Sequence, residues 1–494
     1  MKKRILFVLL PLLLAGCNPS TNSSHSSYSV PSFDTSYDDT IEPNKDEQGN
    51  YLLDFYGLND FHGSVAEDEE ESQPGFSKIA TFLKEKRAEN PGGTVIVSSG
   101  DMWQGSADSN ITHGELVVDL MNYVGFDAMT LGNHEFDWEI SQIEENAQKA
   151  NFPFLGANIV SSETGQRADF ALPSVMIRRG PLNIGIIGTI GASLESSIVA
   201  SALAGYEFAP QAPIVESESE RLKNEGADTV ILLTHDSWAT LYTDGRTIVN
   251  NHYVDAVFSG HAHVTDRHLE NNIPILQTTG MGEQIMHIQL SISATGEVTP
   301  STYEILDSST YVANLTPDSL AQEIYDYYYY NFIKDIKEEV VGKVGSTMNL
   351  MQISYMACYT MLQHARTVDD TVVAAFHNNY GGIRVDSWSK GQMTYGDIYK
   401  TIPFDNYISI FEVTGESIKQ MANQYSAVAT VKETELVNSQ VYKIAIISYL
   451  SEGRAAPYLL DDGVIISGFV RDLIAQEFRD NGTVYPNTYS AYAI

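Results

Sequence analysis

An amide, an imidazole and a carboxylate follow one another within five positions in the stretch Leu131–Trp138. Asn133 offers a carbonyl oxygen that can bind a divalent cation, and Gly132 lets the backbone turn sharply before it. His134 can ligate a metal, donate a proton or stabilise an anion, and Asp137 can hold the imidazole in one tautomer. Alone, the stretch also fits an ordinary polar loop, so its interpretation depends on the rest of the chain.

Similar polar clusters follow other apolar runs of strand length. Including the cluster in Leu131–Trp138, there are five such clusters: Asn59–Gly63, Ser99–Asp101, Gly132–His134, Thr234–Asp236 and Ser259–His263. A single member has a structural explanation, since Asp60 can cap a helix and His261 can lie in a turn. Five clusters after five strands indicate one shared site instead. Carboxylate, imidazole and amide ligands without thiolates favour two divalent ions such as Mn²⁺, Zn²⁺, Fe²⁺ or Co²⁺.

Strands and helices alternate from Tyr51 to about residue 310. The predicted strands are Tyr51–Leu58, Thr94–Ser98, Phe126–Thr130, Ile184–Ile187, Thr229–Leu233 and Ala256–Phe258. The predicted helices between them include Phe76–Arg87, Glu115–Tyr123 and Ile140–Lys149. This alternation implies a layered α/β architecture. Ligands of such sheets bind beyond the carboxyl ends of the strands, where the polar clusters lie.

The composition limits the class of protein and of partner. The chain has 494 residues, enough for two or three domains, and 43% hydrophobic residues, which is typical of soluble globular proteins. Its formal net charge is −35, from 29 Lys+Arg against 64 Asp+Glu. This charge argues against a nucleic-acid polymer or an anionic membrane surface as partner, although metal cations can reverse the field inside a cleft.

A basic stretch and a short apolar run, Ile5–Leu14, begin the chain and predict a targeting segment. Leu13–Cys17 is similar to a bacterial lipobox. That similarity implies cleavage before Cys17, lipidation of Cys17 and an exported protein anchored on the extracytoplasmic face of the membrane. The alternative is a plain secretory peptide. Residues 18–48 are rich in small and polar residues and predict a flexible tether.

The polar clusters resemble the signature of the dinuclear metallophosphoesterases. The longer strings Asn59–Gly63, Gly100–Ser106 and Gly132–Asp137 are similar to the bacterial secreted 5′-nucleotidase and 2′,3′-cyclic phosphodiesterase branch. The resemblance implies a four-layer αββα sandwich, two divalent ions such as Zn or Mn, and catalysis by His134 with Asp137. It also implies these metal ligands: Asp60, His62 and His263 at one site, Asn133, His235 and His261 at the other, and Asp101 bridging the two ions.

The C-terminal part resembles the substrate domain of the same family. The similar segments are Asn378–Arg384, Met393–Tyr399 and Ile402–Asn406. The resemblance implies a smaller α+β domain in which the substrate is bound by Asn379, Arg384, Phe404 and Tyr449. A guanidinium grips phosphate bidentately, and an aromatic face stacks on any base. By residue type alone, Phe404 also fits a core position.

Two features depart from the family pattern. Ile353–Gln363 holds no Arg where the family has a second phosphate-binding Arg, and Arg366 is the nearest substitute. The loop after Tyr449 lacks the family's nucleoside-binding Asp and carries Arg454 instead. Arg454 would either meet an additional acidic group of the substrate or be a surface charge.

Three other stretches have structural interpretations. The four tyrosines 327–330 would point all round a helix and predict interdomain packing rather than a stacking platform. The acidic run at residues 67–71 predicts a solvated loop, with recruitment of cations as the alternative. Cys358 is expected to be a buried, inert thiol.

These observations predict five segments. They are a signal peptide at 1–17, a tether at 18–48, a dimetal phosphoesterase domain at 49–310, a linker helix at 311–339 and a substrate-binding domain at 340–494. The expected activity is hydrolysis of nucleotide phosphate esters by a monomer. The alternatives are a 2′,3′-cyclic nucleotide phosphodiesterase, a nucleotide-sugar hydrolase and a non-catalytic nucleotide-binding lipoprotein.

Overall fold

The computed structural model describes residues 40–494 except residues 70, 204, 313 and 380. The predicted signal peptide, Cys17 and residues 18–39 of the predicted tether lie outside the described residues. Residues 40–48 lie against the first domain, where the backbone N–H of Asn44 donates to Asn90 Oδ1 at 2.9 Å. Within the described residues, no helix has both the length and the apolarity needed to cross a membrane.

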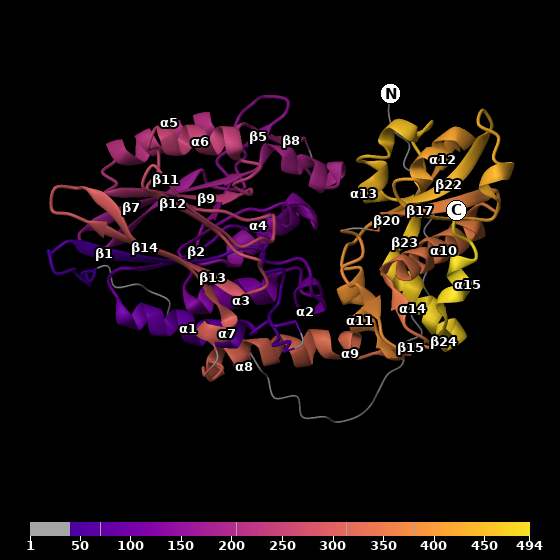
Figure 1. The fold of residues 1–494 in the computed structure, drawn as a ribbon, viewed down its shortest axis with the longest axis horizontal. Coiled ribbons are helices and arrows are strands. Elements are labelled where there is room, and N and C mark those ends of the chain that lie inside the picture. Colours follow the sequence, from indigo (N-terminus) through magenta and orange to yellow (C-terminus); the bar gives the residue numbers. More distant parts are fainter. Residues whose placement is uncertain (1–39, 70, 204, 313, 380) are drawn as a thin grey trace.

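Two sheets pack face to face in the first domain, and helices cover both outer faces (Figure 1). The first sheet has the order β14 (Val298–Asp307), β13 (Gln284–Ile292), β1 (Tyr51–Leu58), β2 (Thr94–Ser98), β3 (Ala128–Thr130) and β4 (Phe154–Leu155). The second has the order β11 (Asp266–Glu270), β12 (Ile273–Gln277), β10 (Ala256–Phe258), β9 (Thr229–His235), β7 (Leu182–Ile190) and β6 (Ser174–Arg179). This is the predicted four-layer αββα arrangement.

Helices and short elements complete the first domain. The helices are α1 (Phe76–Glu89), α2 (Ala107–Asn110), α3 (Glu115–Val124), α4 (Glu139–Lys149), α5 (Gln211–Asn224) and α6 (Tyr242–Asn250). The short elements are η1 (His134–Phe136), η2 (Ala192–Ser197), η3 (Ala200–Leu203), β5 (Ile159–Ser161) and β8 (Tyr206–Phe208). Helices α1 and α3 cover the first sheet, and α5 and α6 cover the second.

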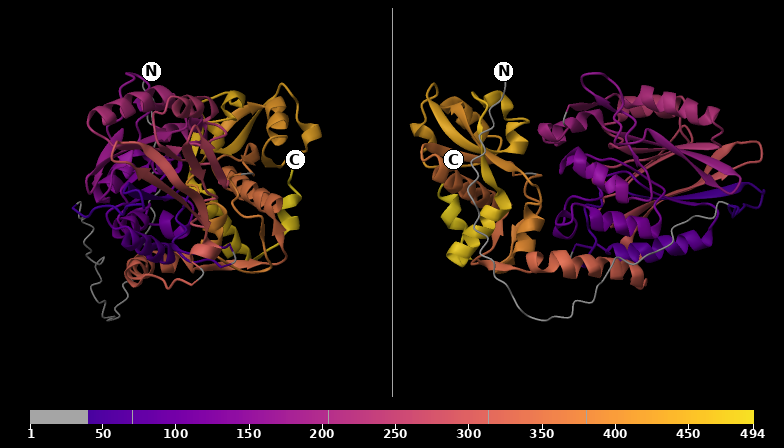
Figure 2. Two further views of the ribbon diagram at one scale, coloured as in Figure 1. Left: turned by 60° about the vertical axis from the view of Figure 1, so that its left-hand side comes forward. Right: turned by 180° about the vertical axis from the view of Figure 1, so that it is seen from behind.

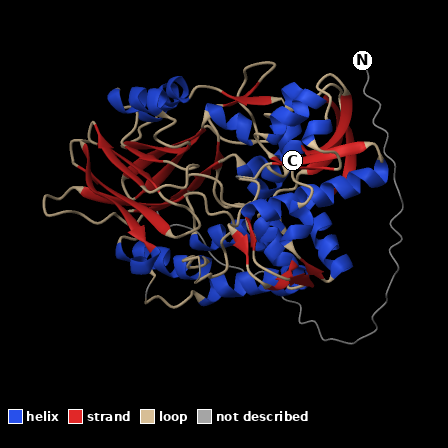
Figure 3. Ribbon diagram, turned by 45° about the vertical axis from the view of Figure 1, so that its right-hand side comes forward, coloured by secondary structure: helices blue, strands red, loops and turns tan. Residues whose placement is uncertain are grey.

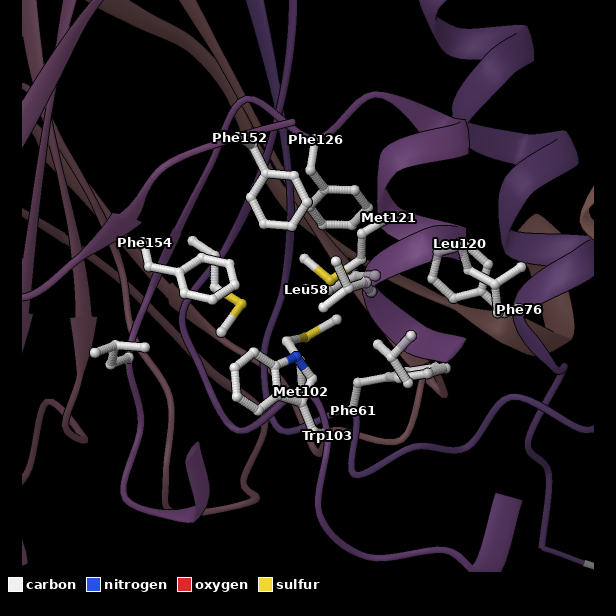
Figure 4. Packing of buried hydrophobic residues seen from close by; sticks show 14 of the residues in the cluster. Leu58, Phe61, Phe76, Met102, Trp103, Leu120, Met121, Phe126, Phe152 and Phe154 are labelled. Carbon is white, nitrogen blue, oxygen red and sulfur yellow. The ribbon is translucent and has the colours of Figure 1, made fainter. Parts of the chain in front are cut away.

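The alternation of side chains along β1 explains why this sheet needs two partners. Leu53 and Phe55 point into the layer between the two sheets, whereas Tyr56 and Leu58 point toward the helices. Figure 4 shows this helix-side core, with Leu58 among aromatic rings and methionines. Burying a side chain such as Leu58 contributes about 1.5–3 kcal/mol, so both faces stabilise the sheet.

The strand predictions are confirmed, with differences at the ends. β1, β2 and β10 have the predicted bounds. β3 begins at Ala128 rather than Phe126, because Gly125 ends helix α3 in the left-handed conformation just before it. The antiparallel strands β11 and β14 carry many polar residues, so their apolar pattern is too weak to predict them.

A helical run connects the two domains along the lower edge of the first domain (Figures 1 and 2). It comprises α7 (Ser308–Tyr311), α8 (Ser319–Tyr328), the π-helical turn η4 (Tyr329–Ile333) and α9 (Lys334–Lys337). The Tyr328 hydroxyl donates to Asp119 Oδ2 at 2.6 Å, while Tyr330 is 66% exposed. Tyr328 therefore packs on the first domain, whereas packing between the domains was predicted, and Tyr330 is largely exposed.

The second domain contains a five-stranded sheet and two smaller sheets of three and two strands, together with helices (Figure 3). Its strands are β15 (Val340–Val344), β16 (Met348–Asn349), β17 (Val372–His377), β18 (Ser387–Trp388), β19 (Gly391–Thr394), β20 (Tyr407–Thr414), β21 (Ser426–Ala429), β22 (Val441–Ile447), β23 (Val464–Phe469) and β24 (Thr483–Val484). Its helices are α10 (Leu350–Val368), α11 (Tyr395–Thr401), α12 (Gly415–Ala422), α13 (Ser448–Ser451), α14 (Val470–Asn481) and α15 (Pro486–Ser490). Cys358 is fully buried on α10, and burial raises the pKa of its thiol, which confirms the inert interpretation.

His287 forms an ion pair on the first sheet that makes stability depend on pH. Its Nδ1 lies 3.0 Å from Glu304 Oε1 and its Nε2 lies 2.9 Å from Asp54 Oδ1. A neutral imidazole can donate from only one nitrogen, so this geometry requires the imidazolium. Burial opposes the charge, but the two carboxylates outweigh it and raise the pKa of His287 above 6.5.

We expect the free energy of unfolding to fall as pH rises above about 6.5, because stabilisation by a group with a raised pKa is complete only below its unfolded value. In His287→Gln this fall should be smaller. Denaturant titrations of both proteins between about pH 6 and 9 measure it. Parallel stability curves for the two proteins would contradict the assignment.

Candidate active site

The five polar clusters meet where the carboxyl ends of the central strands of both sheets converge. β1, β2 and β3 are parallel neighbours in the first sheet, and β9 and β10 are parallel neighbours in the second. His235, at the end of β9, approaches the Ser99 carbonyl oxygen, just after β2, with its Nδ1 at 2.7 Å. Ligands from two sheets therefore form one site.

The first group of candidate ligands consists of Asp60, His62 and His263. Their ligand atoms all lie within 4.8 Å of one another. The Nε2 atoms of His62 and His263 face each other at 3.1 Å, and Asp60 Oδ1 lies 3.4 Å from His263 Nε2. Asp60 and His62 are buried, and His263 is partly exposed, which leaves one side of the group open.

The second group consists of Asp101, His235 and His261, with Asn133 between the two rings. Asp101 Oδ2 lies 3.1 Å from His235 Nε2. Asn133 Oδ1 lies 3.1 Å from His235 Nε2 and 3.0 Å from His261 Nδ1. The other Asp101 oxygen, Oδ1, accepts the backbone N–H of His134 at 2.8 Å. A bridging role for Asp101 stays a prediction.

The donor set fits two divalent cations. Asp60 Oδ1 is buried without a hydrogen-bond partner, an arrangement that is costly unless a cation lies against it. The Nδ1 atoms of His62 and His235 lie 2.6 and 2.7 Å from the carbonyl oxygens of Gln104 and Ser99. Those contacts direct the Nε2 lone pairs into the site, as second-shell partners of metal-binding histidines do.

Backbone strain is concentrated on these ligands. Five of them have left-handed φ angles, between 49° and 78°: Asp60, His62, Asp101, His261 and His263. Each such residue costs about 1–3 kcal/mol and persists only where the surrounding structure imposes it. Such strain is typical of functional sites and agrees with a ligand role.

Gly132 was predicted to allow a sharp turn, but its φ angle is not positive, so its role is different. A Cβ atom on Gly132 would lie 2.2 Å from Asp101 Oδ1. The glycine therefore allows the third cluster to approach Asp101 closely. Glu135 supports the same approach, because its buried carboxylate accepts the backbone N–H groups of Asp101 and Gly132 at 2.8 and 2.7 Å.

His134 lies beside the metal ligands and opens into a cavity of about 200 Å³. Its Nδ1 donates to Asp137 Oδ2 at 2.8 Å, which leaves Nε2 available for a substrate. Burial alone would lower the pKa of His134, but the carboxylates of Asp137 and Asp101 outweigh it and raise that pKa. The ring can therefore carry a proton to donate, and its catalytic role stays a prediction.

The second domain supplies the opposite wall of this cavity. Phe404 and Tyr449 line it and are half-buried, so Phe404 is not a core residue. The Phe404 ring stacks 5.6 Å from the His134 ring. The Arg384 guanidinium lies 5.1 Å from the centre of the Phe404 ring, and Arg384 lines the same cavity.

Three predicted substrate-binding residues lie elsewhere. Arg366 donates to the Val372 carbonyl oxygen at 2.7 Å, at the end of α10, and so holds the turn into β17. Arg454 is exposed and is not among the cavity-lining residues, which favours the surface-charge interpretation. Asn379 approaches Met351 Sδ at 3.7 Å, and its neighbour Asn378 lines the cavity instead.

Other lining residues were not predicted. They are Ser197, Val199, Ala202, Asn378, Gly381, Asp405 and Asn406. Asp405 and Asn406 belong to the segment that resembles the family, so their position next to Phe404 was the available signal. Val199 and Ala202 come from the first domain near η3, and nothing in their sequence indicates a binding role.

The acidic run at 67–71 is not merely a solvated loop. Lys400 of the second domain pairs with Asp68 Oδ2 at 3.2 Å and with Glu71 Oε1 at 3.4 Å. Glu67, Asp68 and Glu71 also line a larger cavity, of about 820 Å³, that includes His62 and Arg384. The acidic residues therefore join the two domains beside the metal ligands.

A four-layer α/β domain with carboxylate, imidazole and amide ligands at the strand ends defines the calcineurin-like phosphoesterases. The family model described as calcineurin-like phosphoesterase matches residues 53–265. The model described as 5′-nucleotidase, C-terminal domain, matches residues 329–430. The chain belongs to the metallophosphoesterases that carry a 5′-nucleotidase C-terminal domain, the bacterial 5′-nucleotidase family.

Individual relatives share this organisation at low identity. Endonuclease YhcR of Bacillus subtilis is 26% identical over 411 residues, which are 75% of this chain and 32% of the relative. The 5′-nucleotidase of Vibrio parahaemolyticus is 23% identical over 431 residues, 76% of this chain and 74% of the relative. This chain thus spans about a third of the endonuclease's length. The solved structure of a 5′-nucleotidase precursor from Thermus thermophilus has a TM-score of 0.70 at 16% identity, covering 88% of this chain and 97% of that one, and shares the fold.

Proposed function

We propose that the protein hydrolyses phosphate esters of nucleotides, in the manner of a 5′-nucleotidase, and releases nucleoside and phosphate. The observation that carries the proposal is the cavity between the domains. It places a proton donor, His134, between two candidate metal groups on one side and an aromatic pair with a guanidinium on the other. Those are the groups that a phosphate, its leaving oxygen and a base require.

Each set of side chains has a separate role in this reaction. The two groups of ligands would hold divalent cations, which when bound lower the pKa of a shared water and offset charge on the phosphoryl group. Arg384 binds the phosphate, and Phe404 and Tyr449 enclose the base. His134, held by Asp137, donates its Nε2 proton to the leaving oxygen of the nucleoside.

A substrate panel with added Mn²⁺ or Zn²⁺ tests the proposal. The panel contains a nucleoside 5′-monophosphate, a 2′,3′-cyclic nucleotide, a nucleotide sugar, glycerol phosphate and a DNA oligonucleotide. We expect the highest kcat/KM for the monophosphate. A preference for the cyclic nucleotide or the nucleotide sugar would favour one of the alternative activities, and nucleotide binding without turnover would favour a non-catalytic binding protein. We expect no cleavage of the oligonucleotide, because the chain has a net charge of −35.

Phe404→Ala should raise KM for the nucleoside monophosphate. Stacking on an aromatic ring contributes about 1–3 kcal/mol per base, which corresponds to roughly a fivefold to hundredfold change. Steady-state kinetics on the monophosphate and on glycerol phosphate, which has no ring, measure the effect. If KM rises equally for both substrates, Phe404 does not contact the base.

We also propose that the protein acts as an exported monomer held to the membrane through a lipid on Cys17. The lipobox-like sequence Leu13–Cys17 supports this proposal. Metabolic labelling with a fatty acid should label the wild-type protein and leave Cys17→Ala unlabelled. Label in both proteins, or in neither, would contradict the anchor.

A further inference from the structure

The loop that carries Phe404 is hydrogen-bonded directly to the first domain. The indole N–H of Trp138 donates to Asp405 Oδ2 at 3.2 Å. The carboxamide of Asn110 donates to the Pro403 carbonyl oxygen at 3.0 Å. Both neighbours of Phe404 in the sequence therefore contact the domain that holds the metal ligands.

These two donors come from segments that hold the catalytic groups. Trp138 directly follows Asp137, the partner of His134. Asn110 Oδ1 accepts the backbone N–H of Gly105 at 2.9 Å, and a Cβ on Gly105 would lie 2.6 Å from that of His62. The contacts thus join the base-stacking loop to the catalytic pair on one side and to a metal ligand on the other.

Within the second domain, the loop rests on Arg471, which is 5% exposed. Its guanidinium donates to the Phe404 carbonyl oxygen at 3.2 Å and to Asp405 Oδ1, and stacks 4.2 Å from the Tyr399 ring. The two oxygens of Asp405 are therefore divided between the domains, with Oδ1 toward Arg471 and Oδ2 toward Trp138.

The same loop also positions the second aromatic residue. Asn406 Oδ1 accepts the Ser448 hydroxyl and the backbone N–H of Tyr449, each at 3.0 Å. A displacement of the loop would therefore move Phe404 and Tyr449 together, and both rings would lose their position relative to His134.

We propose that Asp405 is a positioning residue. Through its hydrogen bond with Trp138, it fixes the position of the two stacking rings, Phe404 and Tyr449, relative to His134 and Asp137. The inference rests on the proposed function, because it concerns substrates with a base. A nucleotide must contact the two stacking rings and the phosphate site at the same time, so its binding depends on their relative position. A phosphate ester without a ring contacts only the phosphate site, so its binding does not depend on the position of the stacking rings.

Trp138→Phe tests the proposal, because it removes the N–H donor and keeps an aromatic ring beside His113, whose ring is 5.1 Å away. We expect kcat/KM for a nucleoside monophosphate to fall about tenfold or more, mainly through KM, as for loss of a hydrogen bond to a charged group. Turnover of glycerol phosphate should change less than about twofold. Equal losses on both substrates, or no loss on either, would overturn the proposal.

Trp238→Phe is the matched control. The Trp238 indole also donates to a carboxylate at 3.2 Å, that of Glu270, but both residues belong to the first domain, and neither lines the cavity. Its kinetics should equal those of the wild type. A nucleotide-specific loss in Trp238→Phe as large as that in Trp138→Phe would also overturn the proposal.

Asp405→Asn provides a second, independent variant that keeps the size of the side chain and removes the charge. It should also show a nucleotide-specific loss. The Trp138→Phe, Asp405→Asn double variant should lose little more kcat/KM than the single variant with the larger loss, because Trp138 acts through Asp405. Fully additive losses would contradict the coupling. If wild-type enzyme hydrolyses glycerol phosphate but no nucleotide, the proposed function fails instead.

Discussion

His134→Ala should lower kcat for a nucleoside 5′-monophosphate by about a hundredfold or more while both metal ions stay bound. The Nε2 atom of His134 is free to face the substrate, because Nδ1 is occupied by Asp137 at 2.8 Å. A nucleoside alkoxide is a poor leaving group and needs a proton. The loss should therefore be smaller for p-nitrophenyl phosphate, whose phenolate leaves without one.

The control for this variant is His268→Ala. His268 also pairs with an aspartate, since its Nε2 lies 2.6 Å from Asp266 Oδ1, but the pair lies on the edge strand β11 outside the site. Metal analysis accompanies the kinetics. Loss of metal from His134→Ala would assign His134 to the ligands, and equal losses on both substrates would exclude donation to the leaving oxygen.

Asp101→Asn should have the largest effect on metal content. The carboxylate is buried, lies 3.1 Å from His235 Nε2 and has a pKa far below its ordinary value, since nearby imidazoles outweigh the cost of burial. An amide of the same size removes the negative charge from the second ligand group. We expect fewer than two metal ions per chain and a fall in kcat of about a thousandfold, as several kcal/mol of stabilisation are lost.

Asp266→Asn is the matched control, because it also changes an aspartate that pairs with a histidine, outside the site. Metal content by mass spectrometry and kcat at saturating metal should be unchanged in this control. Two bound ions and near-normal kcat in Asp101→Asn would show that Asp101 does not hold the metals.

The metal site could be predicted from the sequence because its residues follow strands. Asp60, Asp101 and His235 each come within three positions of a strand end, and parallel strands bring those ends to one edge. The left-handed φ angles of the ligands could not be predicted, since non-glycine residues rarely adopt them. They depend on the packing of the two sheets.

The substrate side was harder to predict because it depends on contacts between domains. Arg384, Phe404 and Tyr449, which the family resemblance indicated, line the cavity, and Asn378 rather than Asn379 lines it with them. The hydrogen bond from Trp138 to Asp405 joins residues 267 positions apart, and no local pattern indicates such a pair.

Restoration of activity by metal tests the central claim most directly. The protein is stripped with a chelator, and phosphate release from a nucleoside 5′-monophosphate is then measured as Mn²⁺ or Zn²⁺ is titrated back. The account predicts no turnover without metal and full turnover at two ions per chain. Turnover by the stripped protein, or none at any metal concentration while two ions are bound, would contradict it.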